Sequence, residues 1–316
     1  MKKFDVVALG EILIDMTYAG KSEAGQTLFE QNPGGAPANV LAAVQRLGGQ
    51  TAFIGKVGKD MHGEYLRQVL EGENICTEGL LVDENVFTTL AFVNLDANGD
   101  RSFSFARKPG ADTCLTKEEV NNSLIQNSKI FHVGSLSLTD EPAKSATLAA
   151  LKEAKKAGSI ISYDPNYRAP LWKNEQAAVE GMRSILSYVD VMKISDEETV
   201  LLTDCKDPRK AAEVLLACGV KTVIVTMGGE GALVGNKKGF ITSKAMDVPV
   251  KDTTGAGDSF MGGFLFKLAQ SGKKCDELSA LELQSFADFA NRVAGFCVQK
   301  RGAIVAMPFA QELFAL

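Results

Sequence analysis

The sequence is poor in the residues that usually build metal centres. Its 316 residues include two histidines and six cysteines, and no two cysteines form a C-x-x-C pair. A zinc site therefore has few candidate ligands. Scattered cysteines of this kind are usually small buried apolar residues in a reducing compartment.

Long apolar runs are also missing. No segment is long and apolar enough to span a bilayer, and residues 1–5 lead straight into a strand-like segment without the apolar core of a secretion signal. We therefore expect a cytoplasmic protein with no membrane partner. The net charge of -5 argues against a nucleic-acid partner held by phosphate contacts.

What is present is an ordinary globular composition, with 45% hydrophobic and 23% charged residues. Apolar runs of strand length alternate with helix-like stretches, which predicts an α/β fold with a mostly parallel sheet covered by helices on both faces. The strands are expected at 6–9, 52–57, 130–133, 160–163, 189–194 and 222–226. Helices are expected at 38–47, 142–157, 177–188 and within 277–299.

One region breaks this alternation. Residues 88–105 alternate apolar and polar side chains around Asn98-Gly99, a dipeptide typical of hairpin turns. Residues 13–27 add further candidate strands. We interpret these pieces as a small β-sheet that projects from the main domain, although an ordinary edge hairpin would give the same pattern.

The most informative segment is 252–260, with the sequence Asp-Thr-Thr-Gly-Ala-Gly-Asp-Ser-Phe. An extended stretch precedes it and a helical apolar stripe follows it, so a glycine turn opens a helix. Gly255 and Gly257 let the backbone approach a ligand closely. Successive N–H groups at a helix start, aided by the helix dipole, form an anion site.

Asp258 stands at the edge of this predicted anion site. The segment is not a Walker A loop, because no Lys-Ser or Lys-Thr follows, and it is not G-x-G-x-x-G, because Phe260 occupies the third position. A base beside developing phosphate charge is what phosphoryl transfer to a hydroxyl needs. A simple helix cap is the alternative role of Asp258.

Two earlier segments offer polar groups of the kind that grip hydroxyls. Gly34 and Gly35 lead into a helix with Pro37 in its first turn and Asn39 one turn in. Asp15 follows the first strand, where open α/β sheets place their sites. A plain capped helix and an exposed loop aspartate are the alternative interpretations.

Together these segments resemble the ribokinase-like (PfkB) carbohydrate kinase family. Gly34, Gly35 and Asn39 match its early signature, and residues 252–258 match its late D-T-x-G-A-G-D signature. The resemblance covers the whole chain, 1–316, as one kinase domain. It implies a doubly wound sheet with a small β lid, here from about 13–33 and 86–110.

The resemblance also implies roles for individual residues. Asp258 would be the catalytic base, and the backbone amides of Gly255, Ala256 and Gly257 would form the anion hole for the transferred phosphate. The implied sugar ligands are Asp15, Gly34, Gly35, Asn39 and Asp258. ATP and Mg²⁺ follow as co-substrate and cofactor.

The nucleotide side is implied by residues 226–231, which resemble the family's nucleotide-binding turn. The implied nucleotide contacts are Thr226, Gly228, Gly231, Gly255, Gly257 and Asn291, with Gly302 near the adenine. Lys193 is a further candidate nucleotide contact that would neutralise phosphate, with an exposed lysine at a strand end as the alternative interpretation. Asp252 and Thr254 stand where many members hold a monovalent cation, so K⁺ activation is a hypothesis. Glu198 would hold Mg²⁺ through water, while Ser195 replaces the family asparagine three residues earlier.

Two stretches favour fructose as the substrate. Residues 164–172 and 107–112 resemble segments of fructokinases and supply Arg168 and Arg107 as sugar contacts. The same arginines occur in 2-keto-3-deoxygluconate kinases, where one would grip a carboxylate, and surface ion pairs would explain them as well. A non-catalytic sugar-binding regulator and a nicotinamide oxidoreductase are alternatives from other classes.

A homodimer is also expected, because the exposed face of the lid sheet could pair with the same face of a second subunit.

Overall fold

A nine-stranded sheet forms the centre of the molecule, a computed structural model that describes residues 2–95 and 101–314. Its strands lie in the order β13 (Gly239–Ser243), β12 (Ala232–Asn236), β11 (Thr222–Thr226), β10 (Val191–Ser195), β9 (Ile160–Asp164), β8 (Ser128–Gly134), β1 (Phe4–Leu9), β4 (Thr51–Gly58) and β5 (Cys76–Asp83). Neighbours from β11 to β5 pair in parallel, while β12 and β13 are antiparallel.

The strands bury both faces, as near-continuous apolar runs predict. On β1, Val6 and Ala8 enter one apolar cluster, and Val7 and Leu9 enter the other, because successive side chains of a strand point to opposite faces. The first cluster packs under α1 (Ala36–Arg46), α2 (Met61–Gly72), α8 (Ala256–Ser271) and α9 (Ala280–Cys297). The second packs under α3 (Asn122–Gln126), α4 (Ala143–Lys156), α5 (Glu175–Arg183), α6 (Asp196–Thr203) and α7 (Pro208–Ala217).

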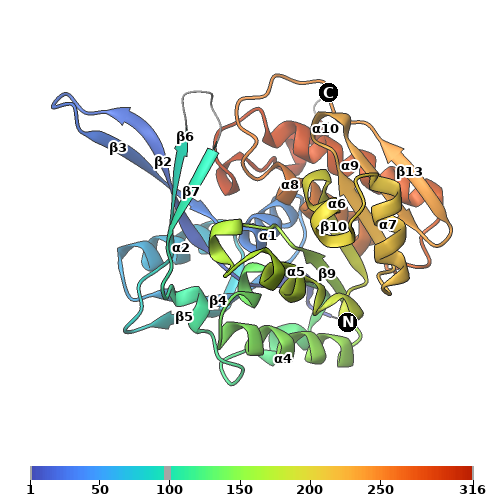
Figure 1. Ribbon diagram of the computed structural model, residues 1–316, viewed down its shortest axis with the longest axis horizontal. Helices are drawn as coiled ribbons and strands as arrows, with labels where there is room; N and C mark the ends of the chain where they lie inside the picture. Colours follow the sequence, from blue (N-terminus) through green and yellow to red (C-terminus); the bar gives the residue numbers. More distant parts are fainter. Residues whose placement is uncertain (1, 96–100, 315–316) are drawn as a thin grey trace.

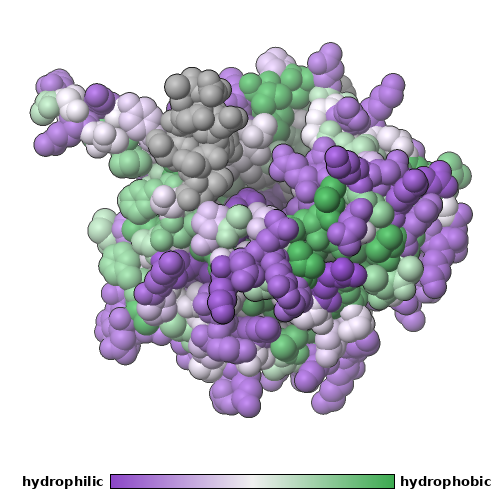
Figure 2. All heavy atoms as spheres, in the orientation of Figure 1, coloured by the Kyte–Doolittle hydropathy of each residue, from purple (hydrophilic) through white to green (hydrophobic). Residues whose placement is uncertain are grey.

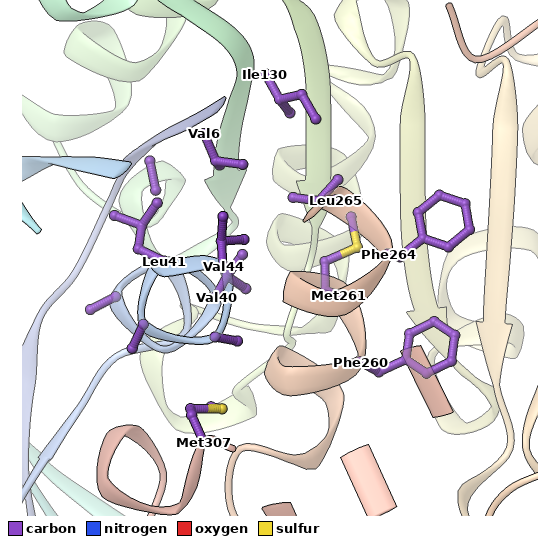
Figure 3. Close-up of a cluster of buried hydrophobic side chains, with 14 of the residues drawn as sticks. Val6, Val40, Leu41, Val44, Ile130, Phe260, Met261, Phe264, Leu265 and Met307 are labelled. Atoms are coloured by element: carbon purple, nitrogen blue, oxygen red, sulfur yellow. The ribbon is translucent and has the colours of Figure 1, made fainter. Parts of the chain in front are cut away.

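Helices α1 and α8 pack directly against each other over the sheet. Figure 3 shows Val40 and Val44 of α1 beside Met261 and Leu265 of α8, with Val6 and Ile130 of the sheet next to them. Both helices begin at the same side of the molecule as the carboxyl end of β1. Their first turns therefore come close together there.

A second sheet of four strands projects from this body. Its order is β3 (Thr27–Gly34), β2 (Leu13–Lys21), β6 (Leu90–Leu95) and β7 (Arg101–Ala106), and Figure 1 shows the β2–β3 pair extending away from the main domain. Its apolar side chains include Leu28 and Phe29, each 45% exposed. In Figure 2 the tip of this arm carries mostly hydrophilic side chains, as does the face over α4 and α5.

The predicted α/β class, with a doubly wound mostly parallel sheet and a small additional sheet, is confirmed. The expected hairpin turn at Asn98-Gly99 lies outside the described residues. The helix expected at 177–188 is α5, and it ends at Arg183. Ser184 donates its backbone N–H to the carbonyls of Glu180 and Gly181 and its hydroxyl to Gly181, which tightens the last turn, and a 3-10 turn follows at Leu186–Tyr188.

The chain ends in α10 (Ala310–Phe314). Among residues 2–95 and 101–314, no helix combines the length and the apolarity needed to cross a bilayer.

Candidate active site

A cavity of about 350 Å³ lies where the carboxyl edge of the central sheet meets the second sheet. The order of the central sheet reverses around β1, because the chain first builds β4 and β5 on one side and then β8 to β11 on the other. Ligands of open α/β sheets bind beyond the carboxyl ends of the strands at such a switch point. The walls include Asp15, Asn39, Arg168, Lys193 and Asp258.

The start of α8 forms one wall of the cavity. Gly255 is the N-cap, with a φ of 75° in the left-handed region, which glycine adopts without steric cost. The first turn has no side-chain cap. The N–H of Ala256 donates to the carbonyl oxygen of Thr253 at 3.2 Å, whereas the N–H of Gly257 has no backbone partner among the described residues. This geometry, with Gly255 and Gly257 in the lining, is that of a helix-start anion site.

Asp258 is the third residue of α8 and not its cap. Its Oδ2 accepts a hydrogen bond of 2.8 Å from Nδ2 of Asn39, which lies in the first turn of α1. The close packing of α1 on α8 makes this contact possible, because a Cβ on Gly262 would lie 2.5 Å from the Cβ of Ala43. The carboxylate is thus aimed by a neighbouring helix into the cavity.

Burial raises the pKa of Asp258 to about 6, and the negative charge of Asp164 acts in the same direction. The hydrogen bond from Asn39 and the charges of Lys193 and Arg168 oppose this shift. A carboxylate with this pKa is ionised at neutral pH but is a stronger proton acceptor than an exposed aspartate.

Asp15 and Gly35, two further predicted sugar-binding residues, line the same cavity. Asp15 lies in β2, and its carboxylate occupies the space that a Cβ on Gly34 would need. Gly35 has a φ of 107°, and a Cβ there would lie 2.6 Å from the carbonyl oxygen of Glu11. Gly34 therefore leaves room for the Asp15 carboxylate, and Gly35 allows the close approach of the backbone after β1.

Glu11 also lines this cavity, although its sequence position after β1 gave no specific role. Its Oε1 accepts a hydrogen bond of 3.1 Å from the N–H of Ala36 at the start of α1. Burial raises its pKa to about 7. The sequence could have indicated this residue, because Glu11 follows the carboxyl end of the first strand, where open α/β sheets place their sites.

A second cavity of about 250 Å³ adjoins the first. Asn166, Arg168 and Lys193 line both cavities. Nζ of Lys193 lies 2.7 Å from Oδ2 of Asp164. Burial by itself would lower the pKa of Lys193, but the carboxylates of Asp164 and Glu198 raise it above its usual value, so the ammonium stays charged.

Glu198 and Ser195 form the far wall of the second cavity. Ser195 caps α6, accepting from the N–H of Glu198, while Oε2 of Glu198 accepts from the N–H of Ser195 at 2.8 Å. Oε1 of Glu198 accepts from the N–H of Tyr167 at 2.7 Å. The serine that departs from the family pattern thus has a capping role that fixes this glutamate.

The remaining predicted nucleotide residues gather beside the second cavity. Thr226 ends β11 and pairs in register with Ser195 of β10. A Cβ on Gly231 would collide with the backbone after Ser243, and Nδ2 of Asn291 donates to Oγ of Ser243 at 2.8 Å. Gly228 begins the intervening 3-10 turn. None of these four residues is among the described residues that line either cavity.

Arg107 is not among the residues that line either cavity. Its guanidinium is 1% exposed and forms an ion pair of 2.7 Å with Asp112. It also donates to Oγ1 of Thr139 at 2.9 Å and to the carbonyl of Leu136 at 2.8 Å. The structure therefore places this arginine in a buried network at the base of the second sheet.

Asp252 and Thr254 line the first cavity. Oδ1 of Asp252 accepts from the N–H of Thr254 at 2.9 Å and from its hydroxyl at 2.7 Å, while Oδ2 accepts from the N–H of Gly302 at 3.0 Å. Within the described parts of the chain, no group of three or more His, Cys, Asp or Glu side chains is arranged to hold a metal ion.

Comparison with known proteins agrees with this geometry. The model of the pfkB family of carbohydrate kinases matches residues 3–310. Probable fructokinase-5 of Arabidopsis thaliana is 43% identical over 308 residues, 96% of this chain and 94% of the relative. Fructokinase-2 of Oryza sativa subsp. japonica is 43% identical over 319 residues, covering 98% and 94%.

Solved structures give the same result. The fructokinase of Xylella fastidiosa with bound ATP superposes with a TM-score of 0.91 at 32% identity, over 100% of this chain and 98% of the other. The fructokinase of Vibrio cholerae O395 in a fructose, ADP and calcium ion bound form has a TM-score of 0.89 at 32% identity, covering 98% of each chain. This chain therefore belongs to the pfkB family of carbohydrate kinases.

Proposed function

We propose that this protein transfers the γ-phosphoryl group of ATP to the primary hydroxyl of fructose. The observation that carries the proposal is Asp258, a carboxylate with a pKa of about 6 in the first turn of α8, where no side chain caps the helix. Asp15 and Asn39 complete a polar cavity around it. Fructose is favoured because the curated relatives quoted above are fructokinases.

In the proposed reaction Asp258 accepts the proton of the sugar hydroxyl as its oxygen attacks the γ-phosphorus. The bond between that phosphorus and the β,γ-bridging oxygen breaks, and ADP leaves with the electron pair. The amides of Gly255, Ala256 and Gly257 stabilise the charge on the transferred phosphoryl oxygens. Asp15, Gly34, Gly35 and Asn39 orient the sugar for this attack.

We assign the two arginines different roles. Arg168 lines both cavities and can reach the sugar or the phosphate. Arg107 supports the second sheet through Asp112, because its guanidinium is already held in that buried network. The second sheet, within 13–33 and 86–110, acts as a lid that excludes water from the transfer.

The nucleotide occupies the second cavity and the surface beside it in this proposal. Lys193 meets its phosphates, and Thr226, Gly228, Gly231 and Asn291 lie on the adenine side. Glu198 would hold Mg²⁺ through water, and the ion would supply positive charge that offsets the phosphates. Asp252 and Thr254 border a K⁺ site; a related fructokinase structure contains fructose, ADP and a potassium ion.

A panel of sugars tests the substrate. The values of kcat/KM with MgATP are measured for fructose, glucose and 2-keto-3-deoxygluconate, and we expect fructose to give the highest value. A higher value for 2-keto-3-deoxygluconate would replace fructose, although Arg107 is not placed to grip a carboxylate. Sugar binding without phosphorylation of any member of the panel would favour the non-catalytic regulator.

We also propose that the second sheet pairs with its counterpart in a homodimer. Leu28 and Phe29 of β3 are each 45% exposed, and Tyr18 on the neighbouring strand β2 is 38% exposed, so exposed apolar side chains gather on this sheet. Light scattering with size exclusion should give the mass of two chains, and a Leu28→Asp, Phe29→Asp variant should give one. A monomeric wild-type protein would contradict this proposal.

We further propose that the protein acts in the cytoplasm.

A further inference from the structure

Asp164 is a buried carboxylate to which the reaction described above assigns no role. It is the last residue of β9 and is 2% exposed. Oδ2 accepts the hydrogen bond from Lys193 at 2.7 Å, whereas Oδ1 is buried with no hydrogen-bond partner among the described residues. Such a pair is expensive to bury and rarely stabilises a fold by itself. A functional reason is therefore needed for it.

The ammonium that Asp164 holds lies directly under the anion site. A Cβ on Gly257 would be 3.2 Å from both Nζ and Cε of Lys193. Lys193 also lines the cavity that contains Asp258 and the cavity that contains Glu198. A phosphoryl group that passes from nucleotide to sugar must cross the boundary between these cavities, where Lys193 stands.

A lysine reaches such a point through a flexible four-carbon chain, so its position has to be fixed by a partner. Lys193 is the residue of β10 next to Asp164 of β9, and the 2.7 Å contact fixes the ammonium. The charges that act on Asp258 are those of Asp164 from β9, Lys193 from β10 and Arg168 from the loop after β9, and the amide of Asn39 from α1 donates to it. The thiol of Cys297 in α9 faces it as well, and Glu11, Asp15 and Asp252 line the same cavity. Asp164 is the carboxylate whose charge raises the pKa of Asp258.

We propose that Asp164 is a positioning residue for phosphoryl transfer, which holds the Lys193 ammonium at the boundary between the two cavities and strengthens Asp258 as a proton acceptor through its own charge. This inference rests on the kinase reaction proposed above. It assigns Asp164 two effects that can be measured separately: one on the use of MgATP and one on the pH at which Asp258 titrates.

The test uses Asp164→Asn, which keeps the shape of the side chain and removes its charge. Loss of the fixed ammonium should lower kcat/KM for MgATP about a hundredfold, the usual effect of a small misplacement of a catalytic group. Loss of the negative charge lowers the pKa of Asp258, so the acid limb of kcat/KM for fructose should move to lower pH. The wild-type limb is expected near pH 6.

The matched control is Asp190→Asn. Asp190 also joins β9 and β10, because its Oδ2 accepts from the N–H of Ile161 at 2.8 Å, but it lies at the opposite edge of the sheet, just before β10. We expect this variant to keep both the wild-type MgATP kinetics and the wild-type acid limb. A purely structural role for Asp164 would make the two variants alike.

The outcomes separate the two proposals. If the wild-type protein phosphorylates no sugar, the proposed function fails. If the wild-type protein is active and Asp164→Asn keeps both its MgATP kinetics and its acid limb, the positioning role is wrong. If Asp164→Asn does not fold, a second pair of variants tests the same inference. The single variant Lys193→Met is compared with the double variant that carries both Lys193→Met and Asp164→Asn, in which neither side chain of the pair is charged. The acid limb of kcat/KM for fructose must lie at lower pH in the double variant, and equal acid limbs would overturn the inference.

Discussion

Asp112 is a buried carboxylate that links the first residues before β6 to the first residues after β7, at the open end of this strand pair. Its Oδ1 accepts from the hydroxyl of Thr89, which precedes β6, and its Oδ2 accepts from Nε of Arg107, which follows β7, at 2.8 Å. The sequence suggested Arg107 as a sugar contact, because the order of residues does not reveal that an aspartate five positions later takes up the guanidinium.

We predict that Asp112→Ala destabilises the protein by about 3–5 kcal/mol, because it leaves the Arg107 charge buried without its partner. The free energy of unfolding in urea measures this loss. The matched control is Glu84→Ala, which breaks the exposed pair of Glu84 with Lys59 at 2.7 Å and should cost about 0–1 kcal/mol. Equal losses in the two variants would contradict the assigned burial.

Sequence motifs predicted the residues that line the candidate site better than the buried residues that hold them in place. Asp258, Gly255, Gly34 and Asp15 were singled out by their types and spacing, and all four lie in or next to one cavity. Asp164 begins the segment 164–172 that resembles fructokinases, but the sequence assigned it no role of its own. Its burial and its contact with Lys193 depend on the pairing of β9 with β10, which no local pattern specifies.

At the scale of elements, the site depends on how closely α8 approaches α1. Asn39 and Asp258 are 219 positions apart in the chain, and they meet because both helices begin at one edge of the sheet. Gly262 allows this approach, since a Cβ there would be 2.5 Å from the Cβ of Ala43 and 3.0 Å from the carbonyl oxygen of Val40.

We predict that Gly262→Ala pushes the two helices apart, with a loss of stability of about 1–3 kcal/mol and a fall in kcat/KM of at least about tenfold. Urea unfolding and steady-state kinetics measure the two effects. The control is Gly72→Ala, a helical glycine of α2 with no atom within 4 Å of the added methyl. It should be neutral or up to about 1 kcal/mol more stable. Loss of neither stability nor activity in Gly262→Ala would contradict this packing argument.

Element types were predictable where the apolar period was clear. The strand expected at 222–226 is β11 itself, and the helix expected at 142–157 is α4, which spans Ala143–Lys156. The end of α5 was not predictable, because Ser184 closes the helix through hydrogen bonds to its own last turn, and the apolar stripe continues through the following 3-10 turn into the same core.

At the scale of the whole molecule, the topology concentrates the chemistry at one edge. Parallel strands bring their carboxyl ends to the same side, so Glu11 after β1, Asp164 at the end of β9 and Lys193 in β10 all face the region below the second sheet. The alternation of strands and helices predicted this class of fold. The order of strands, with β8 beside β1, came only from the structure.

The central claim is that Asp258 takes the proton of the sugar hydroxyl while the start of α8 holds the phosphoryl group. The most direct measurement is kcat of Asp258→Asn with fructose and MgATP, together with the binding of each ligand. An asparagine keeps an acceptor for Asn39 but cannot accept the proton, so kcat should fall about a thousandfold while fructose and ATP still bind as they do to the wild-type protein. A variant with near wild-type kcat would contradict the account.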